Sequence, residues 1–245
     1  MCGICGCSDD SETHHHFTTN TLNAHTHGPR ERVQIERDLL DENQQYARKN
    51  QDFFQKHHVT AINLMSSPGS GKTTLLSRSI KDLKAQMDIT VVVGDQQTRH
   101  DADVLTEAGA EALQINTGKV CHIDAHMLGH ALENIRVKER SLLFIENIGN
   151  LVCPAMFELG ESSKVVILSV TEGDNKPIKY PDMFRCADLV ILTKTDLLPY
   201  VDFDIERCID YAKAINPSVE IIKLSANTGE GLAEWYQWLT QNKTL

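Results

Sequence analysis

The stretch Ser66-Ser67-Pro68-Gly69-Ser70-Gly71-Lys72-Thr73-Thr74 constrains the fold of this 245-residue chain more than any other segment. It stands between the apolar run VTAINLM and an apolar-periodic helical pattern. Small residues let backbone N–H groups turn toward a phosphate, and the N-terminus of the helix behind them attracts the same anion. The stretch therefore predicts a phosphate loop. The alternative is a glycine-rich turn with a chance Gly-Lys-Thr, which the strand–loop–helix context disfavours.

Within this loop, Lys72 is placed to reach the outer phosphates and the Thr73 hydroxyl to coordinate Mg²⁺. The usual pattern begins with Gly, and Ser66 is a modest departure from it. The residues predicted to contact phosphate are Gly69, Ser70, Gly71, Lys72, Thr73 and Thr74.

Beyond residue 59, apolar runs alternate with amphipathic patterns. Continuous runs such as TVVVG, LLFIE and VVILSV are typical of strands buried on both faces, which occur in parallel sheets covered by helices. Alternation over roughly 185 residues predicts a doubly wound, mostly parallel α/β domain. The predicted strands are Val59–Met65, Ile89–Gly94, Glu111–Ile115, Ser141–Glu146, Lys164–Val170, Asp188–Thr193 and Val219–Leu224.

Composition separates three zones. Residues 1–29 are polar and rich in Cys and His, and we expect them to form a flexible metal-binding segment. Residues 30–58 lack Gly and Pro and predict one helix that packs on the following domain. Residues 59–245 make up the nucleotide-binding domain. The helical stripe is Val33, Ile35, Leu39, Leu40, Tyr46, Ala47, Phe53 and Phe54.

The sequence Thr193-Lys194-Thr195-Asp196 follows a late buried strand. A carboxylate there can accept hydrogen bonds from the guanine N1–H and N2 amine, so Asp196 is predicted to select guanine, with the stem of Lys194 against the ring. Taken alone, an ordinary loop Asp explains this residue equally well. The motif resembles the N-K-x-D motif of GTPases with Thr193 in place of Asn. Ser225 and Ala226, in Ser-Ala-Asn after the next strand, match the position whose backbone N–H reaches the guanine O6, and the three motifs in this order favour GTP over ATP.

Two carboxylates are predicted to complete a magnesium site beside Thr73. Glu146 is expected to end a buried strand in Glu-Asn-Ile-Gly, which looks like a switch segment whose Gly149 N–H senses the γ-phosphate. Asp95 ends another strand, although it could instead cap a helix. Asn150 stands where many GTPases place a Gln that orients the attacking water, so we expect slow intrinsic hydrolysis. The predicted catalytic residues are Lys72, Thr73, Asp95 and Glu146.

Three of the seven cysteines, Cys2, Cys5 and Cys7, fall within the first seven residues. In a reducing compartment such a cluster is more often a metal or redox site than a disulfide. Three thiolates and the terminal amine suit planar Ni²⁺, whereas His14 as the fourth ligand would suit tetrahedral Zn²⁺. A redox Cys-x-x-Cys is a third option, although such motifs normally open a helix inside a fold.

A second candidate cluster consists of Cys121, His122 and Cys153, which we expect to bind nickel or zinc. Each cysteine alone could be a small buried hydrophobe. Three ligands do not close a tetrahedral or planar site, so a symmetry-related chain could complete it. His126 and His130 share a predicted helical face with His122, for which an exposed polar face is the simple explanation. Cys186 and Cys208 are assigned to packing.

Charge and hydropathy exclude several classes of protein. The formal charge of −10 offers no electrostatic footprint for nucleic acid or an anionic membrane surface. No apolar run reaches the ~18 residues that a membrane span needs. The first twenty residues lack the basic and apolar regions of a secretory signal, so a cytoplasmic location is expected.

Together these motifs resemble the HypB family, GTPases that assist nickel insertion into [NiFe]-hydrogenase. The similarity covers nearly the whole chain, including SSPGSGKTTLL, GDQQT, ENIGNLVCP, EGDNKP and TKTDLLPY. It implies a GTP-hydrolysing nickel metallochaperone with Mg²⁺, Ni²⁺ and Zn²⁺ as its ions. It also implies a nucleotide- or metal-dependent homodimer, and the hydrogenase large subunit and a HypA-type accessory protein as partners.

Two other functions remain open from the sequence. One is a nickel or zinc buffer in which nucleotide binding is vestigial. The other is a GTPase chaperone for a different metalloenzyme, such as urease.

Overall fold

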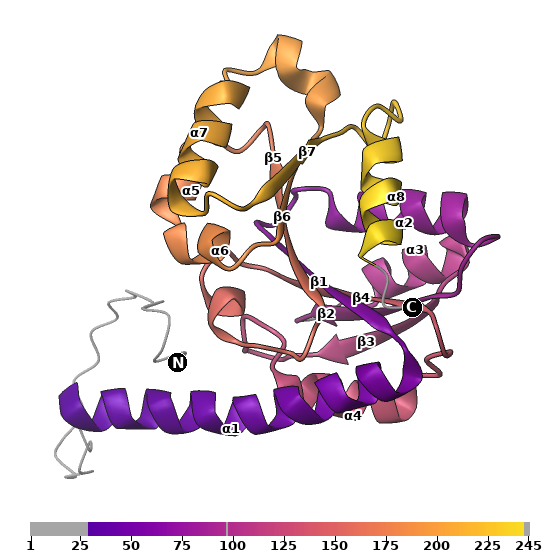
Figure 1. Ribbon diagram of the computed structural model, residues 1–245, viewed down its shortest axis with the longest axis vertical. Coiled ribbons are helices and arrows are strands. Elements are labelled where there is room, and N and C mark those ends of the chain that lie inside the picture. Colours follow the sequence, from indigo (N-terminus) through magenta and orange to yellow (C-terminus); the bar gives the residue numbers. More distant parts are fainter. Residues whose placement is uncertain (1–28, 97, 243–245) are drawn as a thin grey trace, which may run out of the picture.

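The computed structural model describes residues 29–96 and 98–242 (Figure 1). The predicted terminal cluster of Cys2, Cys5 and Cys7 lies outside these residues, as does His14. In the described part of the chain no helix has the length and apolar content that a membrane crossing requires.

The centre of the molecule is a seven-stranded sheet with the order β3-β2-β4-β1-β5-β6-β7, in which each neighbouring pair runs parallel. The central strands are buried along their whole length, as the continuous apolar runs predict. The doubly wound α/β fold is therefore confirmed. The strands are β1 (Thr60–Ser66), β2 (Ile89–Asp95), β3 (Glu111–Asn116), β4 (Leu142–Gly149), β5 (Ser163–Ser169), β6 (Leu189–Thr193) and β7 (Glu220–Lys223).

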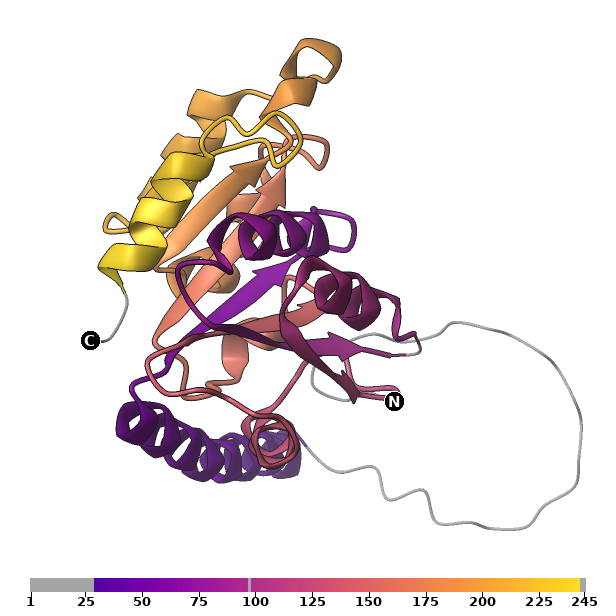
Figure 2. The ribbon, with the colours of Figure 1, turned by 90° about the vertical axis from the view of Figure 1, so that its right-hand side faces the viewer.

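Helices cover both faces of this sheet (Figure 2). The hydrophobic core on one face joins the strands to α2, α3 and α8. On the other face, α1 and α4 cover β1, β2 and β4, while α6 and α7 cover β5 and β6. The helices are α1 (Pro29–His57), α2 (Lys72–Leu83), α3 (His100–Ala108), α4 (Ala125–Asn134), α5 (Lys176–Lys179), α6 (Pro181–Arg185), α7 (Ile205–Ile215) and α8 (Leu232–Gln241), with 3-10 turns η1 (Cys153–Met156) and η2 (Thr195–Tyr200).

The first helix is held on the domain by amides as well as by apolar side chains. Ala47 and Phe54 are buried, as the helical stripe predicts. Asn43 accepts a hydrogen bond from the Ala125 N–H, and Asn50 donates one to the Ala125 carbonyl, each at 2.8 Å. These two buried amides bracket the residue that opens α4, so α1 and α4 lie side by side.

Two predictions about these elements are wrong. Leu39 and Leu40 do not pack as part of the helical stripe, since 42% and 37% of their surfaces are exposed. The strand expected to end at Glu146 continues to Gly149, because Ser66 pairs with Gly149 across a register shift between β1 and β4.

The phosphate loop and the ends of three other strands lie at the same edge of the sheet. The loop follows β1, Asp95 ends β2, Gly149 ends β4 and Thr193 ends β6. In open parallel sheets the crevice outside the carboxyl ends of the strands is where ligands bind.

Candidate nucleotide and metal site

The loop between β1 and α2 has the backbone that phosphate binding requires. Gly69 and Gly71 have φ values of +74° and +98°, a region that side chains other than Gly rarely occupy. The helix α2 begins at Lys72, so its N-terminal N–H groups face the loop. The Lys72 ammonium donates a 2.6 Å hydrogen bond to the Ser66 hydroxyl. The residue that departs from the usual Gly thus contacts the key lysine.

The end of β6 is tied directly to the phosphate loop. The Thr193 hydroxyl donates a 2.7 Å hydrogen bond to the Ser70 carbonyl, and the Lys194 ammonium donates one of the same length to the Gly69 carbonyl. Lys194 itself has φ +60°. Thr193, in place of the usual Asn, therefore ties the phosphate loop to the segment that is predicted to contact the base.

Thr73 and Glu146 form a candidate magnesium site. The Thr73 hydroxyl donates a 2.7 Å hydrogen bond to one Glu146 carboxylate oxygen, and the other oxygen is buried without a protein partner. A hydroxyl and a carboxylate are the hard oxygen ligands that Mg²⁺ prefers, so the residues fit this ion. Burial raises the pKa of Glu146 to about 7, opposed by the nearby charge of Lys72 and by the Thr73 hydrogen bond. Burial also lowers the pKa of Lys72, and the Glu146 carboxylate opposes this shift.

Asp95 lies in the same cavity but is also engaged locally. Its carboxylate accepts hydrogen bonds from the Thr98 backbone N–H at 3.0 Å and the Thr98 hydroxyl at 3.3 Å. It does not cap α3, since Arg99 is the residue before that helix. Asp101, which the sequence analysis did not select, lines the cavity too, and its charge helps to raise the pKa of Glu146. Asp101 stands in the first turn of α3 among other polar residues, and no sequence motif distinguishes it from them.

The predicted nucleotide-contacting residues surround two adjoining cavities. The first has a volume of about 670 Å³ and is lined by the phosphate loop, Glu146, Gly149 and Lys194. The second, of about 140 Å³, is lined by Asp196, Ser225 and Ala226. Gly71, Thr74 and Lys194 line both. One elongated ligand with a polyphosphate end and a base end matches this arrangement.

The smaller cavity has the polarity that a guanine base requires. One carboxylate oxygen of Asp196 is buried and has no hydrogen-bond partner in the protein. A buried acceptor without a partner is costly, and a guanine base supplies two adjacent donors for it.

The switch segment at the end of β4 passes very close to the phosphate loop. A Cβ atom added at Gly149 would lie 2.8 Å from the backbone N and Cα of Pro68, so only Gly allows this approach. Asn147, also not selected from the sequence, is buried at 1% exposure and accepts hydrogen bonds from the N–H groups of Ile123 and Ile148, both at 3.0 Å. Its amide donates to Asn63 on β1 at 3.2 Å.

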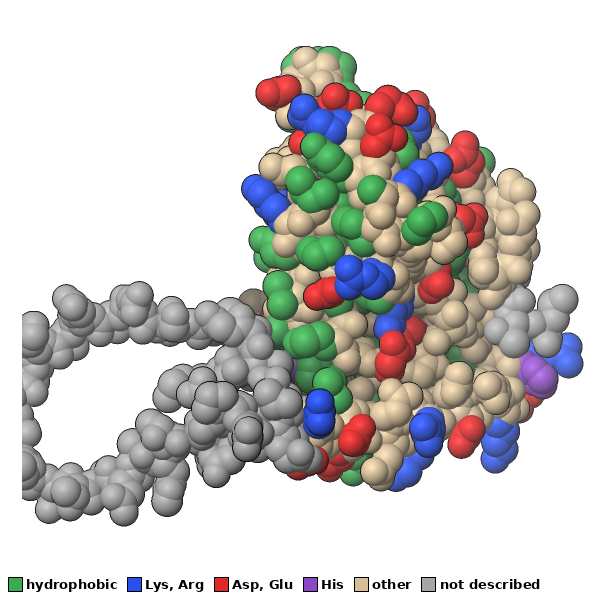
Figure 3. Space-filling view, turned by 60° about the vertical axis from the view of Figure 1, so that its left-hand side comes forward, with side chains coloured by type: hydrophobic (Ala, Val, Ile, Leu, Met, Phe, Trp, Pro, Cys, Tyr) green, Lys and Arg blue, Asp and Glu red, His purple; other side chains and the backbone are tan. Residues whose placement is uncertain are grey.

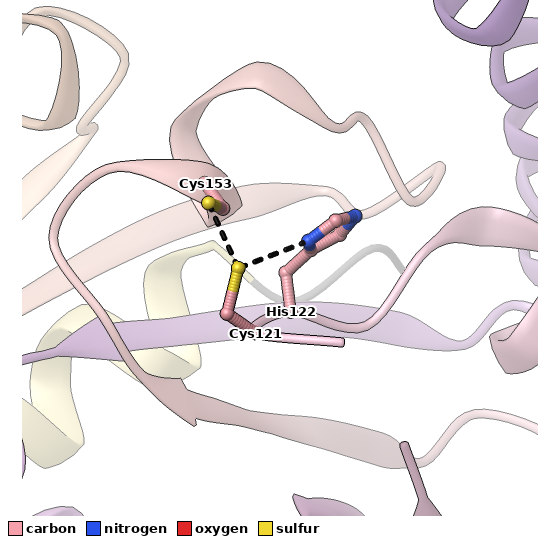
Figure 4. A group of neighbouring side chains, drawn as sticks. All are labelled: Cys121, His122 and Cys153. Carbon is pink, nitrogen blue, oxygen red and sulfur yellow. Dashed lines mark hydrogen bonds between the residues drawn. The ribbon is translucent and has the colours of Figure 1, made fainter. Parts of the chain in front are cut away.

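The predicted second metal cluster is brought together (Figure 4). Ligand atoms of Cys121, His122 and Cys153 all lie within 4.8 Å of one another, with the two sulfur atoms 2.9 Å apart. Two thiols and an imidazole are a donor set suited to nickel or zinc. Burial lowers the pKa of His122, opposed by the charge of Asp124, so the imidazole is neutral and its lone pair is available at neutral pH.

The geometry of this cluster is held by its surroundings. The His122 ring stacks on Phe157 with centroids 3.9 Å apart. The Asn150 amide donates a 3.3 Å hydrogen bond to the Cys121 carbonyl. Cys121 also lines the larger cavity, together with the phosphate loop. The candidate metal ligands therefore adjoin the candidate nucleotide site.

The remaining cysteines and histidines have other environments. Burial raises the pKa of the Cys186 thiol to about 11 and that of Cys208 to about 12. Cys208 lies on α7 and is buried in the core, and Cys186, at the end of α6, is partly buried against the same core. The expectation that His122 shares a helical face with His126 and His130 is wrong, because α4 begins at Ala125 and is capped by the Asp124 side chain.

A parallel sheet with a phosphate loop after β1 and a carboxylate in a base-sized cavity after β6 defines a P-loop nucleotide-binding protein. The family described as CobW/HypB/UreG, nucleotide-binding domain, matches residues 60–223. The hydrogenase maturation factor HypB of Azotobacter vinelandii is 53% identical over 230 residues, covering 93% of this chain and 76% of that protein. The chain belongs to the HypB family.

Solved structures of similar proteins agree with this assignment. HypB from Helicobacter pylori, crystallised in complex with nickel, is 37% identical with a TM-score of 0.79, covering 82% of this chain and 95% of that one. The hydrogenase maturation factor HypB from Archaeoglobus fulgidus is 40% identical with a TM-score of 0.77, covering 82% and 98%.

Proposed function

We propose that this chain is a GTP-hydrolysing nickel metallochaperone that assists nickel insertion into the large subunit of [NiFe]-hydrogenase. The observation that carries the proposal is that Cys121, one of three clustered candidate metal ligands, lines the same cavity as the phosphate loop. Similarity to a protein named as a hydrogenase maturation factor and to a HypB crystallised in complex with nickel supports the same function.

The proposed reaction is attack of water on the γ-phosphorus of GTP, which gives GDP and phosphate. Lys72 and the loop N–H groups stabilise the charge that develops on the phosphate oxygens. Asp196 and the Lys194 stem select and orient the base. Thr73 and Glu146, with Asp95 nearby, would hold Mg²⁺, which neutralises phosphate charge when bound.

Slow turnover is part of the proposal. The side chain of Asn150 donates to the Cys121 carbonyl and accepts a 2.8 Å hydrogen bond from the Val152 N–H. Because both the amide nitrogen and the amide oxygen of Asn150 already take part in hydrogen bonds, this side chain is poorly placed to orient an attacking water. Slow hydrolysis suits a switch that changes state once per delivery.

The cargo sites are proposed from chemistry. Cys121, His122 and Cys153 are proposed to bind nickel or zinc, and Cys2, Cys5 and Cys7 to bind nickel. A homodimer would complete the cluster of Cys121, His122 and Cys153, and exposed Val152 and Met156 beside Cys153 support such an interface. Figure 3 shows a band of hydrophobic side chains reaching the surface of one face of the molecule.

A HypA-type accessory protein and the hydrogenase large subunit are the proposed partners, and the cytoplasm is the proposed location.

Nucleotide turnover provides the first test. Lys72→Ala should abolish phosphate release from GTP, whereas Lys81→Ala, an exposed lysine on the same helix, should leave it unchanged. Release from ATP should be negligible for the unaltered chain. Normal GTP turnover by Lys72→Ala would remove the phosphate-loop assignment.

A second test separates nickel delivery to hydrogenase from the two alternatives. Cells carrying a chain without residues 1–8 should lose hydrogenase activity if the terminal cysteines deliver nickel. Loss of urease activity alone would favour another client enzyme. Activity of both enzymes together with undiminished cellular nickel tolerance would argue against delivery through these cysteines.

A further inference from the structure

A pair of histidines on α4 lies outside the clusters described above. His126 and His130 are four residues apart on this helix, and both are exposed. Their Nε2 atoms are 3.0 Å apart, whereas their ring centroids are 4.5 Å apart. The two rings therefore lean toward each other at their Nε2 ends, into the solvent-facing groove between α1 and α4.

The separation of the two nitrogens matches a pair of neighbouring metal ligands. With metal–nitrogen bonds of about 2.1 Å, two ligands at 90° lie about 3.0 Å apart, and two ligands at the tetrahedral angle about 3.4 Å. The observed 3.0 Å thus corresponds to the right-angled arrangement of octahedral or square-planar ions. In the structure, the two Nε2 atoms are held at this distance by a hydrogen bond between the rings.

Neighbouring side chains hold both rings in this orientation. The Nδ1 atom of His130 lies 3.3 Å from the Glu133 carboxylate, one turn further along the exposed face. A carboxylate at Nδ1 draws the ring proton there and leaves the Nε2 lone pair available, the arrangement usual for metal-ligating histidines. The His126 ring packs against Tyr46 of α1, with centroids 4.6 Å apart. The pair is therefore preorganised from two helices.

We propose that His126 and His130 form a further site for a divalent transition-metal ion, bound through both Nε2 atoms with Glu133 as the supporting carboxylate. Ni²⁺ and Cu²⁺ suit its imidazole donors and its right-angled geometry. Two protein ligands leave the remaining positions to water, so an ion there exchanges readily with solvent. The site involves none of Cys121, His122 and Cys153, and the proposal does not depend on nucleotide turnover.

The test is a titration of the full chain with NiSO₄, followed through the imidazole nitrogen and proton signals of His126 and His130 by NMR. Both histidines should respond over the same range of Ni²⁺ concentration. His130→Gln should weaken the response of His126 at least about tenfold, and His126→Gln should do the same to His130. Glu133→Ala should lower the affinity about tenfold while both histidines still respond.

The matched control is His100→Gln, which removes another exposed histidine at the start of a helix and should leave the paired response unchanged. The titration of the unaltered chain tests the proposal without any variant, so misfolding of a variant cannot affect that result. If His126 and His130 respond at different Ni²⁺ concentrations, or neither responds, the proposal is overturned. It is also overturned if removing one histidine leaves the response of the other intact.

Discussion

Asn147 provides the sharpest test of communication between nucleotide and metal. Its side chain joins the switch strand β4 to Ile123, the residue directly after His122, and to Asn63 on β1. We predict that Asn147→Ala weakens both stability and the influence of the nucleotide on metal affinity.

The cost in stability follows from the groups that this change leaves without partners. Asn147 is 1% exposed and both Ile123 and Asn63 are completely buried, so water cannot replace the lost bonds. Each buried polar group left unsatisfied costs about 1–3 kcal/mol, and two such groups give roughly 2–6 kcal/mol. The midpoint of urea unfolding should fall correspondingly.

The expected effect of Asn147→Ala on the coupling between nucleotide binding and metal binding is smaller than its effect on stability. The hydrogen bond from the Ile123 N–H to Asn147 contributes about 0.5–1.5 kcal/mol net, which corresponds to about a 2- to 12-fold change in an equilibrium constant. If this bond transmits the nucleotide state, the ratio of Ni²⁺ affinities with GDP and with a GTP analogue should shrink by up to that factor. Competition with a coloured chelator measures both affinities in a full chain whose Cys2, Cys5 and Cys7 are changed to Ser.

The control is Asn216→Ala. The Asn216 amide donates to three backbone carbonyls at the end of α6, Phe184, Arg185 and Ala187, none of which takes part in the hydrogen bonds of Asn147. It should lower stability without altering the ratio of affinities. A ratio in Asn147→Ala equal to that of Asn216→Ala and of the unaltered chain would refute coupling through this amide.

Two other predictions address the nucleotide site. Burial raises the pKa of Glu146 from 4.5 to about 7, so the unfolded chain loses the carboxyl proton at a lower pH than the folded chain does. The free energy of unfolding of the nucleotide-free protein should therefore fall by about 3 kcal/mol between pH 4.5 and 7. Glu146→Gln should remove this contribution, seen as a smaller pH dependence of the free energy of unfolding; an unchanged dependence would contradict it. Asp196→Asn should weaken GTP binding and admit xanthine nucleotides, because the amide can donate to the xanthine O2; unaltered GTP affinity would show that Asp196 does not contact the base.

The sequence predicted those features that depend on neighbouring residues or on repeated patterns. The phosphate loop, Thr193–Asp196 and the buried strands are contiguous, so spacing and hydropathy were enough. The exposure of Leu39 and Leu40 could not be foreseen, because α1 is held instead by Asn43 and Asn50, whose partners lie 82 or more and 75 or more residues away. Hydrogen bonds between residues so far apart in the sequence produce no periodic pattern of residue types.

The metal cluster shows the same limit. Its three candidate ligands can be selected from the sequence because thiols and imidazoles are chemically distinctive. Asn147, which positions the segment after His122, is an ordinary amide whose role depends on Ile123 and on Asn63 of β1, 24 and 84 residues away. The helix start at Ala125 also separates His122 from His126, a boundary set by the Asp124 cap that periodicity alone does not locate.

Close packing explains why the two sites should respond to each other. A Cβ atom at Gly149 would lie 2.8 Å from the Pro68 backbone, and one at Gly94 would lie 2.7 Å from the Ile123 side chain. The phosphate loop thus touches the switch strand β4, and the end of β2 touches the segment that carries Cys121 and His122. We therefore expect that a movement of Gly149 toward a γ-phosphate would also displace its neighbours, because an interior this dense has little free space. Cys153 follows Gly149 by only four residues, which span at most ~14 Å of extended chain. We therefore expect the position of Cys153 in the candidate metal cluster to shift when Gly149 moves.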